Sequence, residues 1–177
     1  MKTIIYAILI VVLFTFAVSA QNAAKPETAK AESATKTEAV LRVEVENGKS
    51  LIFTAKDLAK FTRREVKGKA HDEKDALYSG YNLSDILLEA GAKIGKGELR
   101  GKELGAYLLV EAADGYQATF AITELSTDFT DRTILLADTR DGKLLDEKNG
   151  TWQIIVPDDK KHGRWVRQVI ALKLKNT

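Results

Sequence analysis

The chain has 177 residues and nearly balanced charge, with 27 Lys and Arg against 25 Asp and Glu, and 45% of its residues are hydrophobic. This composition is typical of a globular domain and excludes collagen-like, coiled-coil and wholly disordered proteins. The sequence contains no cysteine, which excludes disulfides, thiolate metal sites and cysteine nucleophiles.

The first twenty residues predict a secretory signal peptide. Lys2 supplies a positive charge, an apolar run extends from Ile4 to Val18, and small residues up to Ala20 stand where a signal peptidase cleaves. The alternative is an uncleaved membrane anchor, but the apolar run is shorter than the roughly 20 residues that span a bilayer as a helix. We therefore expect an extracytoplasmic protein, periplasmic or secreted, with no stable membrane anchor after cleavage.

Residues 21–39 predict a flexible linker, and residues 40–177 the globular domain. The linker is built from Ala, Lys, Glu, Thr and Ser without a large apolar residue, so it cannot bury enough surface to offset the entropy of ordering. A solvated helix is the alternative, which Pro26 and the Thr and Ser content oppose. Signal cleavage removes one Lys and no acid, and the nearly neutral chain that remains gives no reason to expect nucleic-acid binding.

The domain is expected to begin with a hairpin. Apolar and charged residues alternate from 41 to 46, which indicates a half-buried strand. Asn47-Gly48 favours a tight turn that leads back into a second strand at 51–53. The stretch from Arg63 to Ala76 is highly charged and is predicted to be an exposed strand or loop.

Two short helices are predicted in the first half of the domain. Thr54 and Asp57 have the spacing of a capping box, which indicates the start of the first helix. Asn82 is the expected N-cap of the second helix, and Gly91 its end. The apolar residues of this second helix share one face: Leu83, Ile86, Leu87 and Ala90.

A glycine-rich connector at 91–105 leads into a second predicted hairpin. Its strands are expected at 107–113 and 116–120, joined through Asp114-Gly115, and a brief helical turn follows at 123–125. The connector lacks the residue order of a phosphate-binding loop.

The last part of the domain predicts three further strands. The apolar run 134–137 suits a strand buried on both faces, and turns are indicated at Asp141-Gly142 and Asn149-Gly150. Apolar residues alternate from Trp152 to Val156, and a final strand is expected from Trp165 to Lys175. The side chains expected to face the core in that final strand are Val166, Ile170, Leu172 and Leu174. The whole pattern predicts a β-rich α+β domain with two or three short helices.

Four motifs follow one another in an order that points to a known family. They are Tyr78-Ser79-Gly80-Tyr81-Asn82-Leu83 before the second helix, Ala113 to Phe120 with Glu124-Leu125, Asp141 to Leu145, and Val156-Pro157 with Gly163 to Val169. In this order the chain resembles the oxidoreductase molybdopterin-binding domain, the sulfite-oxidase-like fold, from about Leu41 to its end. The resemblance implies that β-rich fold.

The sequence departs from the catalytic members of that family. Those members bind molybdenum through a cysteine thiolate, in a segment that corresponds to about Arg63 to Tyr78 here. This chain has no cysteine, and neither Ser79 nor His71 has the charge and polarisability of a thiolate. We therefore expect no molybdopterin cofactor and assign no catalytic residue.

Six residues in two loops are the candidate ligand-binding residues. Arg164 and Arg167 lie beside Trp165 and His162, and a guanidinium next to an aromatic ring suits a phosphate, carboxylate or pterin-like ligand. Trp165 and Arg167 are expected on one face of a strand. The family resemblance implies that Asp114 and Tyr116 line the same cleft. The alternative is structural: arginines that pair with nearby Asp residues, a tryptophan that covers the edge of the core, and a simple turn at 114–116.

No metal site and no hydrolase triad are predicted. His71, Asp72, Glu73 and Asp75 carry metal-ligating groups, but they lack the spacing of a zinc site. His162 has no identifiable nucleophile partner, and no G-x-S-x-G motif occurs.

Three functional hypotheses remain. The leading one is an exported, non-catalytic molybdopterin-oxidoreductase-like domain that binds a small anionic ligand or an envelope protein partner through the two loops. The second is a divergent or accessory molybdopterin-dependent oxidoreductase that holds its cofactor without a cysteine ligand. The third is a structural envelope protein without a small ligand.

Overall fold

The computed structural model describes residues 38–46, 48–69 and 74–176. The predicted signal peptide 1–20, the linker as far as residue 37, Asn47 of the first turn, and His71, Asp72 and Glu73 lie outside the described residues. Within the described ranges, no helix combines the length and apolar character needed to span a bilayer.

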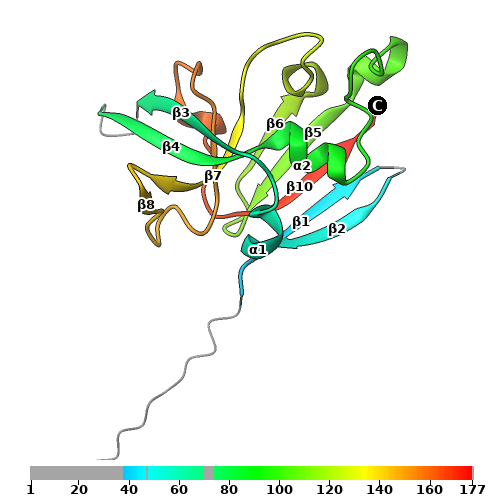
Figure 1. The fold of residues 1–177 in the computed structure, drawn as a ribbon. Coiled ribbons are helices and arrows are strands. Elements are labelled where there is room, and N and C mark those ends of the chain that lie inside the picture. Colours follow the sequence, from blue (N-terminus) through cyan, green and yellow to red (C-terminus); the bar gives the residue numbers. More distant parts are fainter. Residues whose placement is uncertain (1–37, 47, 70–73, 177) are drawn as a thin grey trace, which may run out of the picture. The chain divides into compact units, whose positions relative to one another are not determined.

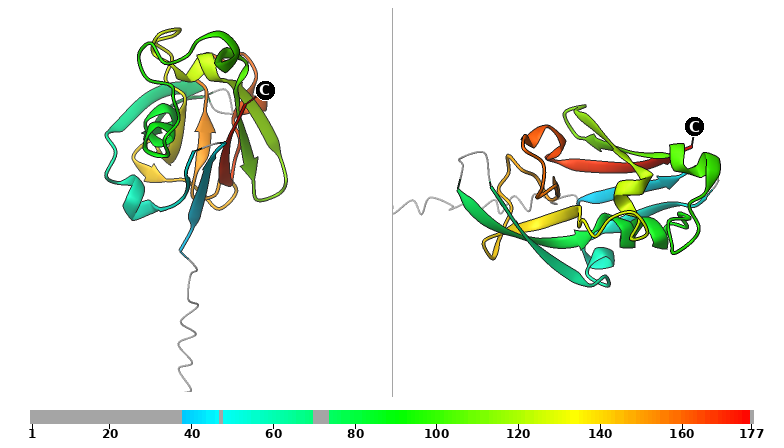
Figure 2. Two further views of the ribbon diagram at one scale, coloured as in Figure 1. Left: turned by 90° about the vertical axis from the view of Figure 1, so that its right-hand side faces the viewer. Right: turned by 90° about the horizontal axis from the view of Figure 1, so that it is seen from above.

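Two five-stranded sheets form the domain (Figures 1 and 2). Sheet A has the order β2-β1-β10-β5-β6. In it the first and last strands of the domain, β1 and β10, pair in parallel, and all other neighbours are antiparallel. Its strands are β1 (Val40–Val45), β2 (Ser50–Thr54), β5 (Tyr107–Ala112), β6 (Gln117–Ala121) and β10 (Val169–Lys175).

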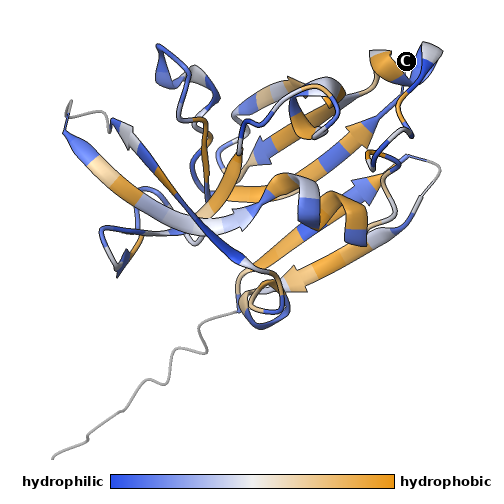
Figure 3. Cartoon of the chain, turned by 45° about the horizontal axis from the view of Figure 1, so that its top comes forward, coloured by the Kyte–Doolittle hydropathy of each residue, from blue (hydrophilic) through white to orange (hydrophobic). Residues whose placement is uncertain are grey.

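Sheet B is antiparallel and has the order β3-β4-β7-β8, with β9 also paired to β7. Its strands are β3 (Arg63–Lys69), β4 (Asp75–Asn82), β7 (Leu135–Arg140), β8 (Lys143–Leu144) and β9 (Gln153–Ile155). The charged strand β3 forms one edge of the sheet and is largely hydrophilic (Figure 3). Charged side chains on an edge strand oppose pairing with other chains.

Two α-helices and three 3-10 turns complete the described domain. They are α1 (Ala55–Leu58), α2 (Leu83–Glu89), η1 (Gly101–Gly105), η2 (Ile122–Leu125) and η3 (His162–Arg164). The predicted capping box is present, because the Asp57 N–H donates to Thr54 Oγ1 and the Thr54 N–H donates to the Asp57 carboxylate. The hydrogen bond from the Thr54 N–H is the main reason that the pKa of Asp57 is lowered to about 2. Asn82 caps α2 through the Ser84 N–H, also as predicted.

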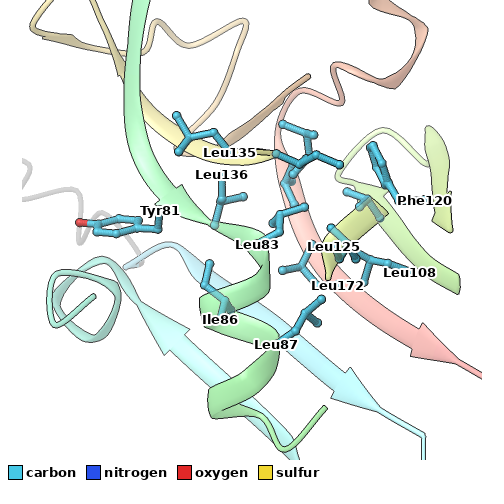
Figure 4. Packing of buried hydrophobic residues seen from close by; sticks show 14 of the residues in the cluster. Tyr81, Leu83, Ile86, Leu87, Leu108, Phe120, Leu125, Leu135, Leu136 and Leu172 are labelled. Carbon is cyan, nitrogen blue, oxygen red and sulfur yellow. The ribbon is translucent and has the colours of Figure 1, made fainter. Parts of the chain in front are cut away.

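The core is one continuous cluster, and α2 packs its apolar face against it (Figure 4). Leu83, Ile86 and Leu87 of α2 are fully buried. They belong to one cluster with buried residues of both sheets, among them Leu108, Phe120, Leu135, Leu136 and Leu172. A cluster that joins both sheets and the helix explains how the domain folds without disulfides.

The predicted hairpins and the second helix are confirmed, but β9 differs from its prediction. The alternation at Trp152, Ile154 and Val156 indicated one buried face, whereas Gln153 and Ile155 are buried as well. β7 pairs with one edge of β9, and the Ile154 N–H donates to the Val166 carbonyl at the other edge, so β9 is an interior strand. An interior strand is covered on both faces, which alternation within the strand did not indicate.

The last strand begins at Val169, not at Trp165 as predicted. Gln168 has a φ of 49° and donates its N–H to the Asn149 carbonyl, so the chain turns immediately before the strand. A register shift between Val169 and Ala171 then places these two residues in the core and leaves Ile170 half-buried. Ile170 was expected in the core, and a β-bulge of this kind reverses the alternation that the sequence suggested.

Gly80 allows a close approach of β4 and β7. A Cβ atom at this position would overlap the carbonyl oxygen of Leu136 and the Cα of Ala137, which are backbone atoms in the middle of sheet B. We expect Gly80→Ala to lower the free energy of unfolding by about 3 kcal/mol, measured by urea unfolding. Gly163→Ala is the control, because a Cβ there meets no atom within 4 Å. Equal unfolding midpoints for the two variants would contradict the close strand contact.

Candidate functional site

The two loops that hold the candidate residues meet at one hydrogen bond. The hydroxyl of Tyr116 donates to the carbonyl oxygen of Gly163 at 2.6 Å. The Tyr116 N–H donates to Asp114 Oδ1, which stabilises the turn before β6, and the Tyr116 side chain is 50% exposed. The turn at 114–116 and the 3-10 turn η3 therefore form one continuous surface.

His162 links η3 to the β3 strand. Its Nε2 lies 2.6 Å from the carbonyl oxygen of Lys69. A carbonyl can only accept, so Nε2 carries a proton in this contact. The imidazole ring also packs edge-to-face against Trp165, with 4.5 Å between the ring centroids. His162 is thus a structural contact between a loop and the end of a strand.

Trp165 is a core residue. Its side chain is 4% exposed, its indole N–H donates to the Val156 carbonyl at 2.9 Å, and its ring meets Tyr78 edge-to-face at 5.5 Å. Gly68 makes room for the ring, because a Cβ there would lie 2.7 Å from Trp165 Cη2. Trp165 and Arg167 precede β10, so the predicted sharing of a strand face is wrong. The indole offers no exposed face for stacking.

Arg164 is bound by two carboxylates. Its Nε and Nη2 donate to the two oxygens of Asp159 at 2.8 and 2.7 Å, and its Nη1 lies 3.0 and 2.9 Å from the oxygens of Glu124. The guanidinium also stands 4.8 Å from the ring centroid of Phe120. The hydrogen bonds to Asp159 are the main reason that the pKa of Arg164 is raised above its ordinary value.

Arg132 extends this arrangement into a network. Its Nη1 donates to Glu124 Oε2 at 3.2 Å, and its Nε lies 3.2 Å from Asp158 Oδ2. We call Glu124, Arg132, Asp158, Asp159 and Arg164 the carboxylate–arginine network. Two guanidinium groups face three carboxylates in it, so a further anion would meet a net negative charge.

Two of the candidate residues make few contacts with this network. Arg167 is half-buried, and the structure records no hydrogen bond or ion pair of its side chain with any described residue. Asp114 contacts only the N–H of Tyr116 among the recorded hydrogen bonds of the described domain. A shallow hollow of about 330 Å³ lies beside Glu124 and Arg132, and none of the six candidate residues lines it.

Sequence reasoning missed the partners of Arg164. Glu124 was noted only as part of a family-like motif, and Arg132 was not singled out. Glu124 lies 40 positions before Arg164, and no spacing rule connects them. A signal existed only for Asp159, which is five positions from Arg164 and was considered as a structural pairing partner.

The residues present do not fit a molybdopterin cofactor. The chain has no thiolate for a high-valent metal, and Ser79, directly after the corresponding region, donates its hydroxyl to Glu65. Arg164, the guanidinium best suited to a cofactor phosphate, is held by Asp159 and Glu124. Among the residues that the structure describes, no group of three or more His, Asp or Glu side chains is placed to hold a metal.

The carboxylate–arginine network should contribute to stability. We expect Arg164→Met to lower the free energy of unfolding by about 2–3 kcal/mol, because it leaves two partly buried carboxylates without their cation. The side chains of Arg164, Glu124 and Asp159 are 29%, 25% and 16% exposed.

Arg63→Met is the matched control for this prediction. Arg63 also binds a carboxylate through two nitrogens, that of Asp138, but its side chain is 43% exposed. Its loss should cost about 1 kcal/mol or less. Chemical denaturation measures both variants, and an Arg164→Met protein as stable as the parent would show that the network is only a surface contact.

Comparison with known proteins supports the fold. No family model matches the sequence, and no curated protein matches it either. Among solved structures, the chain is similar to the sulfane dehydrogenase SoxCD from Paracoccus pantotrophus, with a TM-score of 0.61 and 20% identity. The match covers 78% of this chain and 38% of that one, so the chain spans well under half of its structural relative. The predicted fold class is confirmed: this is a β-rich domain with the sulfite-oxidase-like fold.

Proposed function

We propose that this chain is an exported, non-catalytic binding domain that uses the sulfite-oxidase-like fold to bind a partner protein. One observation carries the non-catalytic part of the proposal, namely that no residue of the chain can supply a thiolate to a molybdenum centre. The extracytoplasmic location rests on the signal-like sequence of residues 1–20. The same fold can support many functions, so the support for a binding role comes from the surface residues.

The surface that best suits a partner is formed by residues 114–116 and 160–163, here called the loop surface. Tyr116 is half-exposed on it, and its hydroxyl is held by Gly163, so the ring is presented in a fixed orientation. A fixed, half-exposed tyrosine is a common anchor in protein interfaces, since its large contact area costs little conformational entropy.

The charges of the loop surface favour an acidic partner. Lys160 and Lys161 are exposed, and no ion pair is recorded for either ammonium group with the described residues. Asp158 and Asp159 are paired with Arg132 and Arg164, but the network keeps one carboxylate in excess, and Asp114 adds another on the loop surface. Lys160 and Lys161 are therefore the groups of this surface that can attract an acidic partner, and such charges steer association and set specificity.

A small anion is a weaker candidate for the same place. The sequence suggested that Arg164 would bind it, but the guanidinium already binds Asp159 and Glu124. An anion would have to break both hydrogen bonds of Asp159 or displace Glu124, which also accepts from the Ala121 N–H. A protein partner needs no such displacement, because it contacts Tyr116 and the lysines.

The first test is elemental and pterin analysis of the full protein purified from its native source. We expect molybdenum and tungsten far below one atom per chain by mass spectrometry, and no pterin fluorescence after denaturation. Stoichiometric metal with pterin would overturn the non-catalytic assignment and favour the divergent oxidoreductase considered from the sequence.

The second test identifies the partner by photo-crosslinking in the native host. A photoreactive phenylalanine at Tyr116 should capture a partner, and the same group at Ile52, exposed on β2, should not capture it. The captured protein is then purified, and its affinity is measured by calorimetry.

Charge reversal then tests the role of the lysines. We expect Lys160→Glu/Lys161→Glu to weaken binding of that partner about tenfold or more, because two attractive charges become repulsive. Lys56→Glu in α1 serves as the control for added negative charge and should bind as the parent does. Unchanged affinity of the double variant would show that the partner does not bind at the loop surface.

A further inference from the structure

A second hollow, of about 470 Å³, lies where the ends of β1 and β10 meet the connector between α2 and β5. The connector runs past the end of β10 in Figures 1 and 2. None of the candidate residues from the sequence lines this pocket. Its volume falls within the range of small-molecule sites, about 300–1,000 Å³.

The floor of the pocket is apolar. It is lined by Ile94, Leu99, Ile122 and Leu174, which come from the connector, η2 and β10. Each of these side chains is less than 9% exposed, so they are fixed in the core and expose only part of their surface to the pocket. A floor of this kind accepts an aliphatic or aromatic group of a ligand.

The rim of the pocket carries charges of both signs. Lys93, Lys102 and Glu103 line it, and the structure records no hydrogen bond or ion pair of these three side chains with any described residue. Glu46 also lines it, but its Oε2 accepts the main-chain N–H of Asn176 at 2.9 Å. Two ammonium groups and two carboxylates therefore stand at the rim, and Glu103 is the carboxylate with no recorded hydrogen bond to a described residue.

The connector that forms one wall is held in place. The Gly97 N–H donates to Asp128 Oδ2 at 2.5 Å, and the Gly95 N–H donates to Glu98 Oε2 at 2.7 Å. At its end, the Ile122 N–H donates to the Ala106 carbonyl at 3.0 Å. The wall is thus formed before any ligand arrives, which lowers the entropic cost of binding.

We infer that this pocket binds a zwitterionic ligand with an apolar body, of the class of short apolar peptides. The carboxylate of such a ligand pairs with Lys93 and Lys102, its ammonium pairs with Glu103, and its side chains lie on the apolar floor. A simple anion would be repelled by Glu103, and a simple cation by the two lysines. This inference concerns a different surface from the loop surface and does not depend on the proposed function.

The probe is the dipeptide leucyl-leucine, compared with two analogues that each lack one charge. N-acetyl-leucyl-leucine has only the carboxylate, and leucyl-leucine amide has only the ammonium. We expect the zwitterion to bind the full protein at least about tenfold more tightly than either analogue, by calorimetry at low salt. Equal binding of the zwitterion and the acetylated peptide would overturn the inference in favour of an anion site, and absence of binding would overturn it outright.

Charge-neutralising variants locate the site. Lys102→Gln and Glu103→Gln should each weaken leucyl-leucine binding about threefold to tenfold, because each removes one ion pair with the ligand. Lys143→Gln and Glu147→Gln are matched controls at exposed positions that do not line the pocket, and they should leave the affinity unchanged.

The sign of the Glu103→Gln effect separates the ligand classes. The substitution weakens binding of a zwitterion, whereas it would strengthen binding of an anion by removing a repulsion. These four side chains are exposed at the surface, so thermal unfolding should confirm that all four variants fold. Tighter binding by Glu103→Gln would refute the zwitterion assignment while leaving the loop surface untouched.

Discussion

The guanidinium of Arg164 joins parts of the domain that are distant in sequence. Through Glu124 it holds η2 at the end of β6, and through Asp159 it fixes the loop in which it lies. The Tyr116 hydroxyl then attaches the turn at 114–116 to the same loop, and Trp165 inserts beneath it against Gly68 and Tyr78. The arrangement of the loop surface therefore depends on a charge that is neutralised within the protein. Arginine is well suited to binding anionic ligands, but Arg164 binds carboxylates of the protein itself.

Local sequence signals predicted the elements that depend on local chemistry. The capping box at Thr54 and the N-cap at Asn82 were correct, because each needs only residues within three positions of one another. The errors fell where distant segments decide the outcome. β9 is buried on both faces and bonds to the distant Val166 at its second edge, and the bulge at Ile170 comes directly after a turn at Gln168 that bonds to Asn149. No periodicity within a single strand contains that information.

The candidate site depends even more than the strands on contacts between residues that are distant in the sequence. The sequence identified the two loops, but it could not show that Glu124, 40 positions away, binds Arg164. The alternation of apolar and polar residues could not show that Trp165 lies in the core either. The space for its ring exists because residue 68, on β3, is a glycine. No sequence motif marks the pocket at the end of β10, because its lining comes from four separate stretches of the chain. Sites assembled from single residues of many elements are visible only in the fold.

The fold adds a second reason, besides the absence of a thiol, why this chain does not suit an anionic metal cofactor. In a sequence alone, the lack of cysteine excludes a thiolate ligand for any metal. In this domain, Arg164, which could still hold an anionic cofactor, is bound by carboxylates, and the lysines Lys160 and Lys161 of the loop surface and Lys93 and Lys102 at the second pocket lie elsewhere. A free arginine attracts an anion. When the arginine is paired with a carboxylate of the protein, that carboxylate repels the same anion. Two independent features of this chain, the missing thiolate and the paired Arg164, therefore oppose an anionic metal cofactor.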